Sequence, residues 1–235
     1  MLALDTSTEQ IAIGLQTGAG SFTRLAVGGA LASARLLPEM KALLAEAGLD
    51  WSDLGAIAFG QGPGAFTGLR TACAVAQGLG FGLQRPLVPL DSLLIVAEDA
   101  RLQLGAGDLE IIVAMDARMD EAYAARYRWR GARWQVLSAP ALYSLPALNA
   151  QWPGAPVQVL AGSALAAFGP RLLLPCDGPR LASEHDRAAA LLRLAVRALA
   201  DGAGVDAAAA LPTYLRDKVA QTTAEREQAK AGVGA

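Results

Sequence analysis

The sequence predicts an α/β protein built from two tandem lobes, each with the element order βββαβαβα. Strand-like alternation gives way to helical spacing of apolar residues in the same order in both halves of the 235-residue chain. The first strand of each half also closes on an aspartate, Asp5 in one half and Asp116 in the other. These two observations predict a duplicated unit, although chance similarity between two ordinary α/β halves is the alternative.

The first half begins with three strands, predicted at residues 2–4, 11–15 and 21–27. Ile11 and Ile13 share one face of the second strand, as expected when a strand is buried on one side. Helical spacing begins at residue 36, and Gly48 is placed to end that helix. The elements that follow are a strand at 55–59, a helix at 70–83, a strand at 86–90 and a helix capped by Asp91 or Ser92 that runs to 104.

The second half repeats this order. Its apolar stripe is clearest in the last helix, where Leu191, Ala195 and Leu199 recur every four residues. The predicted elements are strands at 110–115, 121–129 and 132–138, a helix at 145–151, a strand at 157–160, a helix at 163–168, a strand at 171–174 and a helix at 186–200.

Two such lobes back to back form the RNase H-like pair of the actin, hexokinase and Hsp70 type of ATPase, in which the cleft between the lobes holds a nucleotide. We place the N-terminal lobe at residues 1–106 and the C-terminal lobe at 107–217. Residues 218–235 are polar and weakly patterned, which predicts a flexible tail.

Composition excludes several classes of function. A net charge of −2 gives no general attraction to nucleic acid. One histidine, His185, and two distant cysteines are too few for a usual zinc site or a disulfide framework. No apolar run is long enough to cross a bilayer and no leader is recognisable, so we expect a cytoplasmic protein without membrane contact.

The most informative run is Gly-Pro-Gly-Ala-Phe-Thr-Gly-Leu-Arg at residues 62–70, between a strand and a helix. Glycines here let the backbone approach another surface closely, and a helix N-terminus can present N–H groups to a phosphate. A tight strand-to-helix turn is the alternative interpretation. The run lacks the Lys-Ser/Thr ending of a Walker A loop.

Asp5 and the hydroxyl residues after it suit a turn that binds a phosphate or a hydrated Mg²⁺, although they could equally cap their own backbone. We expect no metal site, no catalytic residue and no cofactor beyond weak binding of ATP or ADP. The residues predicted to line this degenerate cleft are Asp5, Thr6, Ser7, Thr8, Gly62 and Gly64.

The helix after the glycine run carries small residues every four positions, and the first helix carries a leucine-rich stripe. Such helices can pack closely against each other or against another subunit. The residues predicted to form a partner interface are Leu36, Met40, Leu43, Arg70, Cys73, Ala76, Gln77 and Gly80.

Five motifs, in this order, resemble the TsaB (YeaZ) family over residues 1 to about 217. They are Met-Leu-Ala-Leu-Asp-Thr-Ser-Thr at 1–8, Leu-Leu-Pro at 36–38, the glycine run at 62–70, Asp-Ala-Arg-Met at 116–119 and Pro-Thr-Tyr-Leu-Arg at 212–216. Many members carry His-Ser before the Leu-Leu-Pro motif, where this chain has Ala32-Ser33.

The resemblance implies an actin-like ATPase fold and a non-catalytic subunit that heterodimerises with the catalytic subunit TsaD. With the ATPase TsaE, that complex transfers a threonylcarbamoyl group to N6 of adenosine 37 in tRNAs reading codons that begin with A. It also implies homodimers through the helices of the first lobe, and contact with tRNA through the complex. TsaD-like enzymes hold a metal with two histidines after the strand that corresponds to 86–90, where this chain has none.

Two rival functions stay open at this point. A phosphotransferase of the sugar- or acetate-kinase kind would use Asp5 and the glycine run. A metallopeptidase is suggested by the glycoprotease label of the wider family, but the sequence offers few metal ligands.

Overall fold

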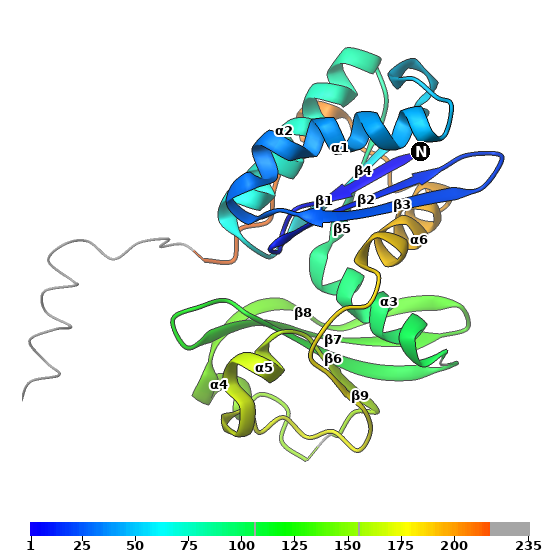
Figure 1. The fold of residues 1–235 in the computed structure, drawn as a ribbon. Helices are drawn as coiled ribbons and strands as arrows, with labels where there is room; N and C mark the ends of the chain where they lie inside the picture. Colours follow the sequence, from blue (N-terminus) through cyan, green and yellow to red (C-terminus); the bar gives the residue numbers. More distant parts are fainter. Residues whose placement is uncertain (106, 155, 217–235) are drawn as a thin grey trace, which may run out of the picture.

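The computed structural model describes residues 1–105, 107–154 and 156–216, so the predicted tail at 218–235 lies outside the described residues. The chain forms two five-stranded sheets with the strand orders β3-β2-β1-β4-β5 and β10-β9-β6-β7-β8 (Figure 1). In each sheet the first three strands pair antiparallel and the later ones join in parallel. The predicted α/β fold of two similar, actin-like lobes is confirmed.

The first half follows the predicted order, with shifts of a few residues at the ends of elements. Asp91, rather than Ser92, is the N-cap of α3, because its carboxylate accepts hydrogen bonds from the backbone of Leu93 and Leu94. The elements are β1 (Leu2–Asp5), β2 (Gln10–Gln16), β3 (Ser21–Val27), α1 (Ala32–Glu46), β4 (Ile57–Gly62), α2 (Phe66–Leu83), β5 (Leu87–Asp91) and α3 (Ser92–Leu104).

The second half has two short helices, α4 and α5, and a longer third strand. Asp186 caps its last helix by accepting a hydrogen bond from the N–H of Ala189 at 3.0 Å. The elements are β6 (Leu109–Asp116), β7 (Glu121–Arg130), β8 (Arg133–Ser144), α4 (Leu145–Asn149), β9 (Val159–Ala161), α5 (Ala164–Phe168), β10 (Arg180–Leu181) and α6 (Arg187–Ala200).

The predicted strand at 171–174 is wrong. Leu172 and Leu174 are buried in the core of the second lobe, but they do not belong to a strand of the sheet. Prolines at 170 and 175 flank them and have no N–H to give to a ladder. The edge strand of this sheet is instead β10, which pairs parallel with β9.

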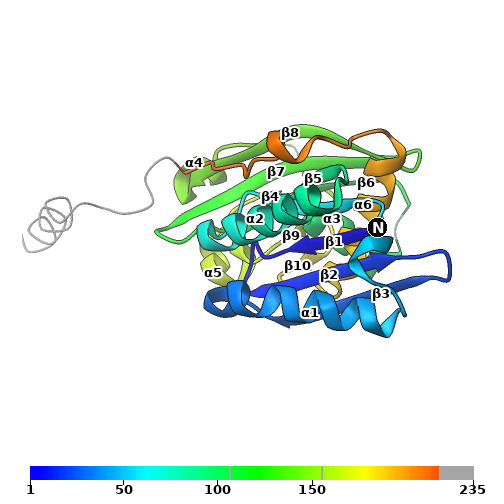
Figure 2. The ribbon, with the colours of Figure 1, turned by 90° about the horizontal axis from the view of Figure 1, so that it is seen from above.

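The layers are stacked so that α1 and α2 cover the outer face of the first sheet (Figures 1 and 2), and α4 and α5 cover the outer face of the second (Figure 1). The helices α3 and α6 lie between the two sheets (Figure 1). Each sheet is therefore covered by helices on both faces, as expected where parallel strands join a sheet.

The two middle helices cross from one half of the chain to the other. Residues of α6 pack on the first sheet, and most of the buried face of α3 packs on the second sheet. Gly14 of β2 permits the close approach of α6, because a Cβ at this position would lie 2.7 Å from Cβ of Leu192.

This crossing revises the expected lobes. The boundary at residues 106–107 does separate the strands of the two sheets, between α3 and β6. However, α6 and the segment after it were assigned to the C-terminal lobe, 107–217, and they pack on the first sheet. Within the described residues, none of the helices is long and apolar enough to span a membrane.

Candidate functional site

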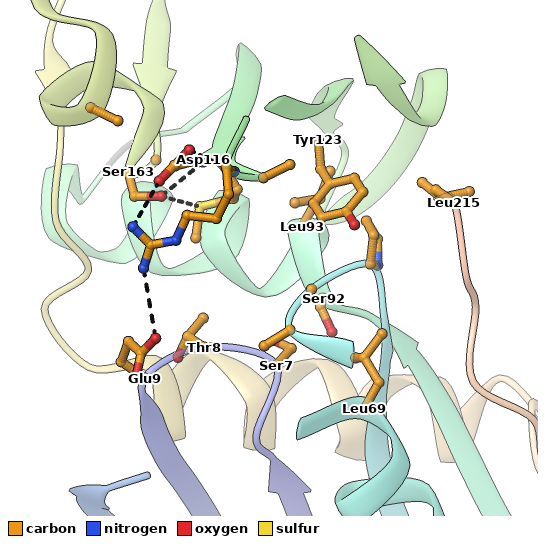
Figure 3. Close-up of a pocket in the computed structure, with 18 of the residues that line it drawn as sticks. Ser7, Thr8, Glu9, Leu69, Ser92, Leu93, Asp116, Tyr123, Ser163 and Leu215 are labelled. Atoms are coloured by element: carbon orange, nitrogen blue, oxygen red, sulfur yellow. Dashed lines mark hydrogen bonds and ion pairs between the residues drawn. The ribbon is translucent and has the colours of Figure 1, made fainter. Parts of the chain in front are cut away.

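A cavity of about 910 Å³ opens between the two lobes. One wall is formed by the turn after β1 and by the glycine run before α2, and the other by the turn after β6 (Figure 3). Hydroxyl groups of Ser7, Thr8 and Ser163 and the ring of Tyr123 line it together with apolar side chains. The ends of β1 and β6, which carry the two aspartates singled out in the sequence, thus lie at the same cleft.

Asp5 is fully buried beneath this cavity, and both of its carboxylate oxygens are bonded. Oδ1 accepts hydrogen bonds from the backbone N–H of Ser7 at 3.1 Å, from Ser7 Oγ at 2.9 Å and from Arg187 Nε at 3.0 Å. Oδ2 accepts one from Ser92 Oγ at 3.1 Å. The carboxylate is thus neutralised from within the protein rather than presented to a ligand.

Arg187, in the first turn of α6, supplies that neutralising charge. Its side chain is 1% exposed, and it also donates to Ser7 Oγ at 2.9 Å and to Glu184 at 2.5 Å. Burial by itself would lower the pKa of Arg187, but the negative charges of Asp5 and Glu184 outweigh this effect and raise the pKa. The guanidinium therefore stays charged beside the carboxylate of Asp5.

Glu184 borders the cavity, and its surroundings shift its pKa. Burial raises its pKa above the ordinary value, and the charge and hydrogen bond of Arg187 oppose that rise only in part. A ligand in the cavity would meet this carboxyl group together with Arg187.

The glycine run folds directly onto the turn after β1. A Cβ on Gly68 would lie 1.8 Å from the carbonyl oxygen of Thr6, and a Cβ on Gly64 would lie 2.6 Å from that of Ser7. Thr6 Oγ1 donates to the carbonyl of Gly68 at 2.6 Å. The close approach expected of these glycines is confirmed, and the surface that they approach is the protein's own backbone.

Of the six residues predicted to line a degenerate nucleotide cleft, three line the cavity and three are buried behind it. Ser7, Thr8 and Gly64 line the cavity. Asp5, Thr6 and Gly62 are buried behind it. Because Asp5 is bonded on both oxygens, the phosphotransferase hypothesis loses the residue that was to hold the metal. In the described part of the chain, no cluster of three or more His, Cys, Asp or Glu side chains could hold a metal ion.

The opposite wall carries a tight turn in which three successive residues have left-handed backbone conformations. Arg118, Met119 and Asp120 have φ values of 65°, 58° and 54°. The Arg118 side chain lies 3.4 Å from Asp116 and 3.8 Å from Glu9 across the opening (Figure 3). Both Arg118 and Glu9 are mostly exposed, so this contact between the lobes contributes little stability.

The chain returns to the mouth of the cleft after α6, in a segment that we call the strap (residues 205–216). The N–H of Thr213 donates to the carbonyl of Gln61 at 2.7 Å. The ring of Tyr214 lies 4.9 Å from that of Phe66, and Arg216 donates to the carbonyl of Ala117 at 2.9 Å. The strap thus contacts both lobes.

Most of the residues predicted to form a partner interface are inside the first lobe. Leu36, Met40, Leu43, Cys73 and Ala76 belong to its hydrophobic core. Gly80 is also buried, and a Cβ there would lie 2.9 Å from Leu87. Their side chains cannot reach a partner, because the leucine-rich and small-residue stripes that suggested an interface are the faces that α1 and α2 turn toward the sheet.

The two polar members of that set have intramolecular partners. Gln77 donates to the carbonyl of Ala210 at 2.9 Å. Arg70 is exposed, stacks on the ring of Phe66 at 3.9 Å and donates to the hydroxyl of Tyr214 at 3.1 Å. Both residues hold the strap against α2.

Sequence reasoning missed Arg187 and Ser92. The signal for Arg187 was present, because it lies four residues before Leu191 and therefore on the apolar stripe of α6. A cation on the buried face of a helix requires a buried anion as its partner. Asp5, at the end of an apolar strand, was the candidate.

Comparison with known proteins agrees with this architecture. The chain matches, over residues 30–177, the profile of a family described as TsaD, tRNA N6-adenosine threonylcarbamoyltransferase. It is 30% identical to the Escherichia coli K12 protein named tRNA threonylcarbamoyladenosine biosynthesis protein TsaB, covering 94% of this chain and 96% of that one. A Haemophilus influenzae protein of the same name is 37% identical over 52% of this chain and 51% of its own length.

Solved structures give the same result. One, described as YeaZ from Pseudomonas aeruginosa, has a TM-score of 0.79 and 39% identity, covering 91% of this chain and 99% of that one. A second Pseudomonas aeruginosa structure, of an uncharacterized protein described as similar to peptidase YeaZ, has a TM-score of 0.81 and 38% identity, covering 92% of this chain and 98% of that one. The chain therefore belongs to the TsaB (YeaZ) family.

Proposed function

We propose that this chain is a non-catalytic subunit of the machinery that makes threonylcarbamoyladenosine in tRNA. It acts in the cytoplasm by forming a heterodimer with the catalytic subunit TsaD, with the ATPase TsaE as a further partner. The modified position is N6 of adenosine 37 in tRNAs that read codons beginning with A, and tRNA is reached through the complex. The relationship to Escherichia coli TsaB over nearly the full length of both chains supports this proposal.

The observation that carries the non-catalytic part is the ion pair between Asp5 and Arg187. A metal-bound nucleotide needs an accessible carboxylate beside its phosphates. Here the carboxylate is fully buried and already paired with a cation at 3.0 Å. We therefore expect at most weak binding of ATP or ADP in the cleft, and the subunit works by docking.

The docking surface that we propose is the outer side of α1 and α2, called here the α1–α2 face. Leu37 on α1 and Phe81 on α2 are 46% and 59% exposed there, so both helices present a large apolar side chain on this side. The small exposed residues Ala74 and Gly78 let another helix approach α2 closely. The exposed residues that define the α1–α2 face are Ala34, Leu37, Lys41, Ala74, Gly78 and Phe81.

A co-purification experiment tests this assignment. Phe81→Asp places a charge in the apolar part of the α1–α2 face, so we expect the variant to lose its association with TsaD and any homodimer formed through the same face. Because Phe81 is 59% exposed, the fold of the single chain should persist. The readouts are TsaD bound to the tagged chain and the thermal unfolding midpoint of the chain alone.

Leu173→Asp is the matched control, since Leu173 is 68% exposed and lies in the second lobe. We expect this variant to bind TsaD as the unmodified chain does. Undiminished binding of TsaD by Phe81→Asp would contradict the proposed docking surface. Modification of tRNA by the purified chain without TsaD would contradict the non-catalytic role.

A further inference from the structure

A second cavity, of about 530 Å³, lies on α6 beside the β2–β3 hairpin and away from the cleft. We call it the arginine groove. In the fold, α6 lies beneath β2 and β3 (Figure 1). The polar residues that line the arginine groove are Gln16, Ser21 and Thr23 from the hairpin, Glu98 from α3, and Arg193 and Arg197 from α6.

The two arginines offer more hydrogen-bond donors than the protein uses. Arg193 is 58% exposed and bonds to Glu98 through Nε at 3.3 Å. Its two terminal nitrogens have no partner among the described residues. The guanidinium of Arg197 stacks on the ring of Trp129 at 4.8 Å. Among the described residues, its nitrogens have no hydrogen-bond partner either. A guanidinium carries five N–H donors, so most of these remain available.

Positive charge is in excess in the arginine groove. The one carboxylate that lines it, Glu98, is already bonded by Arg101 at 2.7 and 2.9 Å and by Trp134 at 2.9 Å. Burial would raise the pKa of Glu98, but Arg101, Trp134 and the charge of Arg193 together hold it below its ordinary value. Glu98 therefore stays ionised, and its single negative charge faces three arginines: Arg101 and Arg193, which are bonded to it, and Arg197, which is not.

The two guanidinium groups are also held in position. Arg197 is fixed against Trp129, whose ring is contacted by Arg101 as well, at 4.3 Å. Arg193 is held by its bond to the buried carboxylate of Glu98. The two arginines are four residues apart on α6, which places them about one turn, or roughly 6 Å, from each other along the helix. Side chains fixed in this way lose little entropy when they bind a ligand.

We propose that the arginine groove binds a phosphate group. Two neighbouring guanidinium groups can donate to the several oxygens of one phosphate. A carboxylate ligand has only two oxygens and would leave more of these donors without a partner. The hydroxyls of Ser21 and Thr23 on the opposite wall can donate to the same group. The carrier of the phosphate is either a small phosphorylated compound or the backbone of RNA, and the chemistry of recognition is shared by both. This inference does not depend on the proposed function.

The test is calorimetric titration of the full chain with pyrophosphate and, separately, with a 12-nucleotide single-stranded RNA, at constant ionic strength. We expect Arg193→Gln and Arg197→Gln each to weaken binding at least tenfold. Arg193→Lys keeps the charge without the fork, so it should weaken binding less. The matched control is Arg85→Gln, an exposed arginine at the end of α2 that does not line the arginine groove.

The thermal unfolding midpoint of each variant shows whether it is folded. If Arg197→Gln disturbs the packing of Trp129, the Arg193 variants still test the proposal, because Arg193 does not contact that ring. Binding of pyrophosphate identifies a small compound as the carrier, and binding of RNA alone identifies a nucleic-acid backbone. Either result supports the proposal when the arginine variants reduce it. Absence of binding to both probes, or binding that Arg193→Gln and Arg85→Gln reduce equally, would overturn it.

Discussion

At the scale of single residues, the pair of Asp5 and Arg187 decides what the cleft can do. The two residues lie 182 positions apart in the chain and meet at 3.0 Å in a fully buried site. Ser7 and Ser92 complete the hydrogen bonding of the carboxylate. A buried pair is stable only when its remaining donors and acceptors are satisfied in this way, because both charges have lost their hydration.

Arg187→Gln should therefore destabilise the chain strongly, since it leaves the buried carboxylate of Asp5 without a counter-charge. We expect a loss of about 3–5 kcal/mol in the free energy of unfolding, measured by urea titration. The control is Arg171→Gln, which breaks an exposed pair with Asp120 and should change that energy by less than about 1 kcal/mol. Equal effects of the two substitutions would show that the buried pair is not a structural element.

At the scale of elements, α2 has two faces of similar composition and opposite roles. Ala76 and Gly80 face the core, whereas Ala74 and Gly78 face solvent. Spacing alone cannot separate them, because small residues recur every four positions on both faces. Only the position of the sheet determines which face is buried, and this is why the small residues of α2 that were predicted to meet a partner lie in the core instead.

Substitutions on the two faces of α2 should act in opposite directions. Ala76→Leu forces three extra carbons into a packed core and should lower the free energy of unfolding by about 1–3 kcal/mol. Gly78→Ala should raise it by roughly 0.5–1 kcal/mol, because glycine weakens a helix interior and a Cβ here meets nothing within 4 Å. Urea titration at a concentration where the chain is monomeric measures both. A gain in stability from Ala76→Leu would contradict this assignment of the faces.

At the scale of the whole molecule, the two halves of the chain are held together because each contributes a helix that packs on the sheet of the other half. The helices α3 and α6 each pack against the sheet of the other half, and the strap contacts both walls of the cleft. The exposed pair between Arg118 and Glu9 adds little to this. The relative position of the lobes therefore depends on apolar packing of the middle helices and on the strap.

Removing the anchor of the strap should free it without unfolding the lobes. Tyr214→Ala deletes the ring packed on Phe66 and the acceptor for Arg70. We expect the amide of Thr213, which bonds to Gln61, to exchange its hydrogen at least about tenfold faster, because local opening becomes easier. Hydrogen-exchange mass spectrometry measures this. Leu211→Ala, at a 67% exposed position of the same segment, should leave the exchange unchanged. If Tyr214→Ala also leaves the exchange of the Thr213 amide unchanged, Tyr214 does not anchor the strap.

The sequence by itself determined the order of the elements, the division of the strands into two sheets and the family. Strands and helices are recognised from contacts within a few residues, and alternation or four-residue spacing records them directly. The close packing of the glycine run could be predicted for the same reason, since glycine at such spacing is a local feature. The false strand at 171–174 shows the limit, because a short apolar run reports burial and not hydrogen bonding.

The tertiary structure alone decided which faces are buried and which charges meet. The pairing of Asp5 with Arg187, the crossing of α6 to the first sheet and the exposure of Phe81 all depend on segments far apart in the chain. A helix with apolar or small residues on more than one face can bury any of these faces, and the sheet on which it packs decides which one is buried. The burial of one face of α6 places Arg187 beside Asp5, so the positive charge that pairs with this carboxylate comes from the protein itself and not from a ligand in the cleft.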